Sequence, residues 1–204
     1  GELYRMPRRE ENRLRFRIPI AGALHTEECD LPIDPYTYGY WLGNGNAIKP
    51  ELTIRTCDVA AVTGNIPYEI SGHWDNVGDS EVVRVPKLNE VLLRSFRDKE
   101  IAPVYLRASV KQRMALLQGL MDSDGCIGKL KGQGAYISTQ ERLACSVSEL
   151  LWSLGIKNNI TTSPSARYGV PTGETLYTIR FTAFDDTKVS RLRRKQANAI
   201  PRNT

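Results

Sequence analysis

The sequence contains no long hydrophobic run and no apolar leader. Hydrophobic residues make up 41% of its 204 residues, but no stretch approaches the roughly 18 uncharged apolar residues that a membrane span requires. The first thirty residues carry Arg and Glu where a secretory signal needs an apolar segment. We therefore expect a cytoplasmic protein that folds and has no membrane partner.

Cysteine and histidine are too sparse for a zinc site. The four cysteines lie far apart without a C-x-x-C pair, and there are only two histidines. The G-x-x-x-x-G-K-[ST] phosphate loop is absent, the run from Asp122 to Gly125 lacks the spacing of a calcium loop, and no nucleophile has a nearby His. We expect reduced, structural thiols and no small-molecule cofactor beyond a metal ion.

Basic residues exceed acidic ones by 28 to 23, and they gather near both ends of the sequence. Residues 187–204 contain six Lys and Arg and no acid, and residues 5–17 contain six arginines. This distribution favours a polyanionic partner such as nucleic acid, although solvated termini would show the same charge.

Turn and capping residues divide the chain into helices and strands. Asp34 and Pro35 predict a helix over 35–43, followed by an extended stretch at 46–48, a strand at 52–56 and a helix at 58–64. A hairpin of 66–74 with 80–85 and a helix over 88–96 follow. Ser109 and Gln112 predict a capping box that opens a helix over 110–121.

The second part of the sequence repeats this order. A segment at 126–130, a turn at 132–134, a strand at 135–138 and a helix over 140–154 are expected. A hairpin of 159–163 with 175–182 follows across a loop at 168–173, and a basic helix over 186–197 comes last.

Paired features support two related halves. The segments 39–45 and 119–125 are 80 residues apart, and the strand ends 54–56 and 137–139 are 83 apart. The strands 83–85 and 179–181 are 96 apart, as are Lys99 and Lys195. The widening offsets indicate insertions in the second copy, with a boundary near 102–108.

Two helices that end in G-x-x-x-x-[D/N]-G have a particular physical use. Gly39 and Gly119 would let two helix backbones approach closely, so that Asn44 and Asp124 project from the helix ends toward one point. Oxygen ligands meeting there could hold Mg²⁺. Equally, Asn44, Asp122 and Asp124 could be only helix-terminating polar residues.

The segments 31–45 and 114–125 resemble the motifs of the LAGLIDADG (dodecapeptide) homing endonucleases, in particular the double-motif monomers found in inteins. The segments 99–103 and 149–156 support this resemblance, which extends over residues 31–199. It implies an α+β fold of two pseudo-symmetric αββαββα halves that form a DNA-binding saddle. The first half would span 31–105 and the second 106–204, with 1–30 a basic segment that formerly joined an intein splicing domain.

The resemblance also implies a function and a site. The function would be Mg²⁺-dependent, site-specific cleavage of a long double-stranded DNA target by a monomer, with Mn²⁺ or Ca²⁺ as possible substitutes. The catalytic residues would be Asn44, Asp124, Lys99 and Lys195, and the metal-binding residues would be Asp124, Asn44, Gly43 and Ser123. The DNA-binding residues would be Lys49, Arg55, Arg84, Lys129, Lys131, Gln133, Tyr136, Arg180, Arg193 and Arg194.

Asn44 departs from the family pattern because it stands where the second acid is expected. An amide oxygen can coordinate metal but adds no negative charge, so cleavage would be impaired or restricted to one strand. The alternative is a binding module for DNA or RNA that has lost cleavage, as in maturase-like relatives. A third interpretation takes both motifs as helix packing in a protein unrelated to DNA.

By the same comparison we expect no splicing chemistry in this sequence. Splicing would need Cys or Ser at the first position and a His-Asn pair at the last, whereas this sequence has Gly1 and the run Pro201 to Thr204. We therefore expect an endonuclease domain apart from its splicing domain, with 13–24 as the former joining segment.

Overall fold

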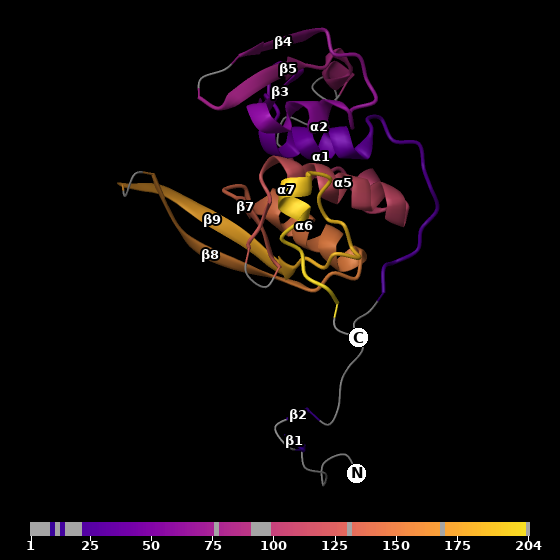
Figure 1. Cartoon of the computed structure of the whole chain (residues 1–204), viewed down its shortest axis with the longest axis vertical. Helices are drawn as coiled ribbons and strands as arrows, with labels where there is room; N and C mark the ends of the chain where they lie inside the picture. The colour runs from indigo at the N-terminus through magenta and orange to yellow at the C-terminus, as the bar shows by residue number, and fades with distance from the viewer. Residues whose placement is uncertain are drawn as a thin grey trace.

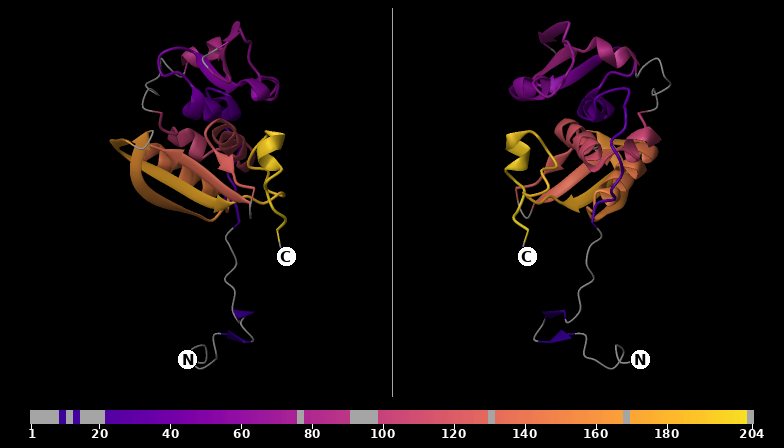
Figure 2. Two further views of the ribbon diagram at one scale, coloured as in Figure 1. Left: turned by 60° about the vertical axis from the view of Figure 1, so that its left-hand side comes forward. Right: turned by 90° about the vertical axis from the view of Figure 1, so that its right-hand side faces the viewer.

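The computed structural model describes residues 22–75, 78–90, 99–129, 132–167 and 170–202, with the backbone of residues 9–10 and 13–14. Two halves pack helix against helix, with α1 (Pro35–Asn44) of the first half against α5 (Val110–Ser123) of the second. Figures 1 and 2 show these helices side by side at the centre, with the two sheets on opposite sides of them. None of the described helices is long and apolar enough to cross a membrane.

Both central helices begin at the caps that the sequence predicts. Oδ1 of Asp34 accepts the Thr37 N–H at 2.9 Å, and Pro35 occupies the first turn. Ser109 and Gln112 form a reciprocal capping box at 3.1 and 3.3 Å. These predictions are confirmed. The caps could be predicted because each depends on residues only three positions apart.

The first half continues from α1 into a three-stranded antiparallel sheet of order β3-β5-β4. Its elements are β3 (Glu51–Arg55), the 3₁₀ helix η2 (Thr56–Asp58), α2 (Val59–Thr63), β4 (Gly72–Asp75), β5 (Ser80–Arg84) and the 3₁₀ helix η3 (Pro86–Leu88). The helix predicted over 88–96 lies mostly outside the described residues, since 91–98 are not described.

Two expectations for the first half are wrong. Residues 46–48 form a turn, because Oδ1 of Asn46 accepts the N–H groups of Ile48 and Lys49 at 2.8 and 3.0 Å. The strand predicted over 66–74 begins only at Gly72, since Ile66 N–H bonds back to the Thr63 carbonyl in a turn. Gly45 forms a single β-bridge with Leu52, whereas the second half has the two-residue strand β6 after its central helix.

The second half has a four-stranded antiparallel sheet of order β6-β7-β9-β8. Its elements are α4 (Pro103–Leu106), α5, β6 (Cys126–Ile127), β7 (Gln133–Ser138), α6 (Glu141–Ser153), β8 (Asn158–Arg167), β9 (Val170–Thr182) and α7 (Arg193–Gln196). Apart from the two halves, β1 (Arg9–Glu10) pairs only with β2 (Arg13–Leu14). α4 is a short helix at the predicted boundary.

Two expectations for the second half are also wrong. The loop predicted over 168–173 is mostly strand, because β8 continues to Arg167 and β9 begins at Val170. The basic helix predicted over 186–197 is present only as the short helix α7, Arg193–Gln196. Asp122 explains this, because its carboxylate accepts the backbone N–H groups of Arg191 and Leu192 at 3.2 and 3.4 Å and holds this chain in a loop.

The central helices touch at two glycines. A Cβ atom added at Gly39 would overlap the carbonyl oxygen of Leu116, and one at Gly119 would overlap that of Tyr36. The contact is reciprocal, since each glycine receives the backbone of the other helix. The close approach predicted from these small residues is therefore present.

Two outer segments connect the halves. The N-terminal strap, residues 22–31, packs on the second half: Leu24 N–H donates to the Ser153 carbonyl at 2.9 Å, and Thr26 Oγ1 donates to the Ala108 carbonyl at 2.6 Å. The buried Arg113 donates to the carbonyls of Ala108, Ser153 and Leu24. The C-terminal clamp, residues 188–195, reaches back from the second half to the first.

Candidate active site and nucleic-acid interface

The two central helices end beside one another. Asn44 is the last residue of α1, and Asp124 caps α5 directly after Ser123. A Cβ atom added at Gly43 would overlap the Ser123 side chain and would lie 3.2 Å from Oδ2 of Asp124. The four residues predicted to bind metal therefore come together at one end of the helix pair.

Two lysines reach these helix ends from different parts of the chain. Nζ of Lys99 donates to the Gly43 carbonyl at 3.1 Å and lies 5.8 Å from the centroid of the Trp41 ring. Nζ of Lys195 donates to the carbonyls of Met121, Asp122, Ser123 and Gly125 at 2.7, 2.9, 3.4 and 2.7 Å. Each ammonium group lies at the negative end of one central helix dipole.

The charges at this end of the molecule act on one another. Burial among the helix ends raises the pKa of the Asp124 carboxyl, and Lys99 and Lys195 act in the opposite direction. Burial lowers the pKa of both lysines, and Asp124 opposes that shift. Asp124 still has solvent-exposed surface, so a ligand can reach it. Lys195 also lies near the carboxylate of Asp122, which favours its charged form more than Asp124 does.

Tyr40 lies one turn before Asn44 on α1. The Tyr40 hydroxyl donates to the Thr53 carbonyl at 3.4 Å. Burial raises the pKa of Tyr40, and a hydrogen bond from the Asn44 side chain opposes this rise. The Asn44 side chain therefore lies beside the Tyr40 hydroxyl at the end of α1.

The donors at the helix ends are all oxygen atoms. In the described part of the chain, no group of three or more His, Cys, Asp and Glu side chains could hold a metal ion. The carboxylate of Asp124 and the amide oxygen of Asn44 nevertheless fit a hard cation such as Mg²⁺. Such an ion takes few protein ligands, keeps several waters and shares its remaining positions with phosphate oxygens.

The predicted strand residues lie on the open faces of the two sheets, the faces turned away from the core of each half. Arg55 and Arg84 are exposed on the first sheet, and Gln133 and Arg180 on the second. Arg55 pairs with Asp79 at 2.9 Å across the exposed surface. Lys49, Lys129 and Arg193 are also exposed, and Lys131 lies outside the described residues.

Two predicted DNA-binding residues, Tyr136 and Arg194, have surroundings that the sequence did not indicate. Tyr136 is 1% exposed because strand side chains alternate, and its neighbour Ile137 takes the open face instead. Arg194 donates from Nε to Oδ1 of the buried Asp58 at 2.8 Å and forms an ion pair with it. This pair holds the clamp on the first half, but the Arg194 side chain is still 43% exposed. The prediction for Tyr136 is therefore wrong, because Tyr136 is a core residue, whereas DNA binding by Arg194 stays a prediction.

Comparison with known family models finds a match within the second half of the chain. Residues 111–186 match the family model described as LAGLIDADG-like domain. A curated relative, the replicative DNA helicase DnaB of Mycobacterium intracellulare, is 29% identical over 185 residues. That alignment covers 91% of this chain but only 29% of the relative.

Solved structures extend the likeness to both halves. A mesophilic variant of the homing endonuclease I-DmoI has a TM-score of 0.51 at 18% identity, over 78% of this chain and 92% of that one. I-DmoI in complex with DNA and Mn has a TM-score of 0.50 at 16% identity, over 74% and 89%. This chain has the LAGLIDADG homing endonuclease fold. The predicted α+β class is confirmed.

Within this LAGLIDADG fold, sequence reasoning missed one buried cluster. Asp122 accepts hydrogen bonds from the hydroxyls of Tyr36, at 2.9 Å, and Ser190. Arg191 lies over the Tyr36 ring at 4.3 Å and donates to Asn65 at 2.9 Å. The sequence signal for this cluster was Asp122 itself. The motif uses one acid, Asp124, as a metal ligand and gives no role to the acid two residues before it.

Proposed function

We propose that this chain is a DNA endonuclease that binds a long double-stranded target as a monomer and hydrolyses phosphodiester bonds with a divalent cation. The observation that carries the proposal is the joint end of α1 and α5, where Asn44 and Asp124 meet beside Lys99 and Lys195. The relatives add support, since I-DmoI structures include DNA with Mn, with Mg and with Ca.

Each residue would have a separate role. Asp124 and the amide oxygen of Asn44 would hold the cation, with the Gly43 and Ser123 backbones beside it. When bound, the cation would supply a Lewis acid for the scissile phosphate and an activated water. Lys99 would stabilise negative charge that develops on phosphate, because among the described residues its ammonium group donates only to the Gly43 carbonyl.

The single carboxylate makes the two strands unequal. With Asn44 in the first half and Asp124 in the second, the site has one protein anion to balance the cation. We therefore expect weak Mg²⁺ binding, intact DNA binding and residual activity as a nick in one strand. The same observation favours a second candidate function, a DNA- or RNA-binding module without cleavage.

We further propose that the domain belongs to an intein and acts in the cytoplasm. The match to 29% of a replicative helicase supports an origin within a larger protein. The segment 13–24 would then be the connection to a splicing domain.

The test begins with a target. Affinity selection from a random-sequence duplex library yields the preferred site, which is then cloned into a supercoiled plasmid. Incubation with Mg²⁺ should give open circles from the natural chain and linear DNA from Asn44→Asp, whose second carboxylate doubles the protein charge on the cation.

The remaining outcomes distinguish an impaired endonuclease from a binding module and from a protein that does not bind DNA. Supercoiled DNA left intact by both proteins, with sequence-selective duplex binding, establishes the binding module. Rapid linear product from the natural chain shows that Asn44 does not impair cleavage. Failure to select any sequence, together with no salt-dependent DNA binding, overturns the proposed function itself.

A further inference from the structure

The outer hairpins of the two halves differ greatly in length. In the second half β8 and β9 contain 10 and 13 residues, whereas β4 and β5 in the first half contain 4 and 5. Figures 1 and 2 show β8 and β9 projecting beyond the rest of the molecule as an arm. We call residues 159–178 the β8–β9 arm.

The arm is nearly free of charge. Within residues 160–178 the sequence has one basic residue, Arg167, and one acidic residue, Glu174, but seven Ser and Thr. A surface that binds phosphates needs cations, whereas hydroxyl and amide groups donate to and accept from the edges of bases. The composition therefore favours base contacts over backbone contacts.

One row of polar side chains continues the open face outward along β8. Asn159 pairs with Arg180, Thr161 with Thr178, and Ser163 with Leu176. Asn159, Thr161 and Ser163 are exposed, and they share one face because strand side chains alternate. Same-face residues recur every ~6.6 Å, which is about two base-pair steps of duplex DNA.

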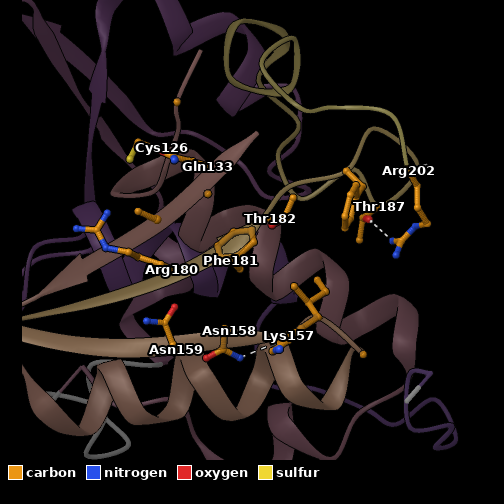
Figure 3. A pocket seen from close by; sticks show the side chains of 16 residues that line it. Cys126, Gln133, Lys157, Asn158, Asn159, Arg180, Phe181, Thr182, Thr187 and Arg202 are labelled. Carbon is orange, nitrogen blue, oxygen red and sulfur yellow. Dashed lines mark hydrogen bonds between the residues drawn. The ribbon is translucent and has the colours of Figure 1, made fainter. Parts of the chain in front are cut away.

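The base of the row meets the proposed DNA-binding residues. A hollow of about 670 Å³ there is lined by Gln133, Asn159 and Arg180 among others, and Figure 3 shows these side chains around it. Farther out, the register shifts between Pro164 and Ala166, and such a bulge bends a hairpin. The row is thus continuous with the proposed interface and curves beyond it.

We propose that the β8–β9 arm reads base edges in one half-site through Asn159, Thr161 and Ser163, so that the second half contacts a longer stretch of DNA than the first. This inference rests on the proposed function. It assigns the added sequence specificity to uncharged side chains and leaves the salt-dependent affinity to Arg84, Arg180 and other cations.

Two variants test the arm on the selected duplex. The first replaces residues 164–175 by Asn-Gly, which joins the paired residues Ser163 and Leu176 through a two-residue turn. The second combines Asn159→Ala, Thr161→Val and Ser163→Ala and keeps the full hairpin. Thr162→Val is the matched control, because Thr162 is exposed on the opposite face.

In hydroxyl-radical footprinting, the shortened variant should lose protection at one end of the site. The triple variant should keep the full footprint. The triple variant should lose affinity by about tenfold per base contact and lose base preference in that half-site, as repeated selection would show. In the triple variant the slope of log Kd against log salt should stay unchanged, because no cation is removed, whereas the shortened variant also lacks Arg167 and Glu174.

Unchanged footprint and base preference in both variants overturn the arm proposal, as does a change in salt slope of one ion or more in the triple variant. Equal losses in Thr162→Val overturn the assignment to one face. If the natural chain selects no sequence at all, the proposed function fails first, which separates the two failures.

Discussion

Lys99 and Lys195 occupy related positions in unequal surroundings. Lys195 is 7% exposed and donates to four carbonyls at the end of α5. Lys99 donates to one carbonyl and adopts a φ of 44°, a region that residues with a side chain rarely occupy. Lys195 therefore acts mainly as a helix cap, and Lys99 is freer to turn toward a phosphate.

Replacing each lysine by Met should separate these roles. Lys195→Met should lower the free energy of unfolding by about 1–3 kcal/mol, because buried carbonyls lose a charged donor. Lys99→Met should change stability less and should slow cleavage in the Asn44→Asp background without weakening DNA binding. Chemical denaturation and plasmid cleavage check both expectations, and equal stability losses in the two variants would contradict them.

Asp124 makes the stability of the metal-free protein depend on pH. Its pKa is raised in the folded state, so the folded chain binds the proton more tightly than the unfolded chain. Its contribution therefore becomes unfavourable as pH rises through the window between the unfolded and folded pKa values. Above that window Asp124→Asn should be more stable than the natural chain, and the difference should vanish below the unfolded pKa of ~3.9.

Thermal unfolding in chelator across pH 3–8 measures this difference, with Asp30→Asn on the exposed strap as control. A difference between Asp124→Asn and the natural chain that is independent of pH would contradict the assignment. In the Asn44→Asp background, Asp124→Asn should also abolish Mg²⁺-dependent cleavage.

At the scale of elements, the contact of α1 with α5 depends on two glycines. The added Cβ in Gly39→Ala or Gly119→Ala would meet backbone oxygen, which cannot turn aside as a flexible side chain can. Each substitution forces the helices apart and should destabilise the protein by about 2–4 kcal/mol, the range for serious core disruption.

Gly22→Ala is the matched control, since a Cβ there has no neighbour within 4 Å. Urea denaturation of the three variants gives the comparison. A loss below about 0.5 kcal/mol in both helix variants would show that the seam accommodates a methyl group.

Local signals predicted the elements better than their register. The caps at Asp34 and Ser109 involve neighbours in sequence, so they were readable. The predicted offset of 83 between the strand ends is wrong by one residue: it equates the buried Ile54 with the exposed Ile137. Arg84 and Arg180 are equivalent at an offset of 96. Their strand partners are Glu51 and Ala135, so the first strands of the two sheets are related by an offset of 84.

Partners distant in sequence could not be predicted. Nothing in the sequence near Arg194 points to its ion-pair partner Asp58, 136 positions earlier. Tyr136 illustrates the same problem in a strand, where a shift of one residue exchanges the core face and the open face. The convergence of Asn44 and Asp124 was accessible because both follow from the ends of two readable helices.

At the scale of the molecule, the clamp joins the halves through a charged pair. Arg194 holds the pKa of Asp58 below its ordinary value. The folded state thus gains stability above the unfolded pKa of Asp58, and this gain is lost as pH falls through the lower folded value.

A double-mutant cycle of Arg194→Ala and Asp58→Ala tests this pair. The coupling energy should be about 1–3 kcal/mol at pH 7 and should shrink toward pH 3. The side chains of Arg193 and Arg194 are both exposed, but Arg194 is already paired with Asp58. The salt slope of DNA binding should therefore fall less in Arg194→Ala than in Arg193→Ala. An equal fall in the two variants would show that Arg194 contacts DNA phosphate as directly as Arg193 does.

The strap has a consequence for folding during synthesis. Leu24, Thr26 and Cys29 bind partners between Ala108 and Ser153, so this segment leaves the ribosome long before those partners exist. The second half has its helices and sheet within one continuous stretch and can fold as a unit. The strap therefore has no partners while the first half is translated. It can bind the second half only after α5 and α6 have been synthesised.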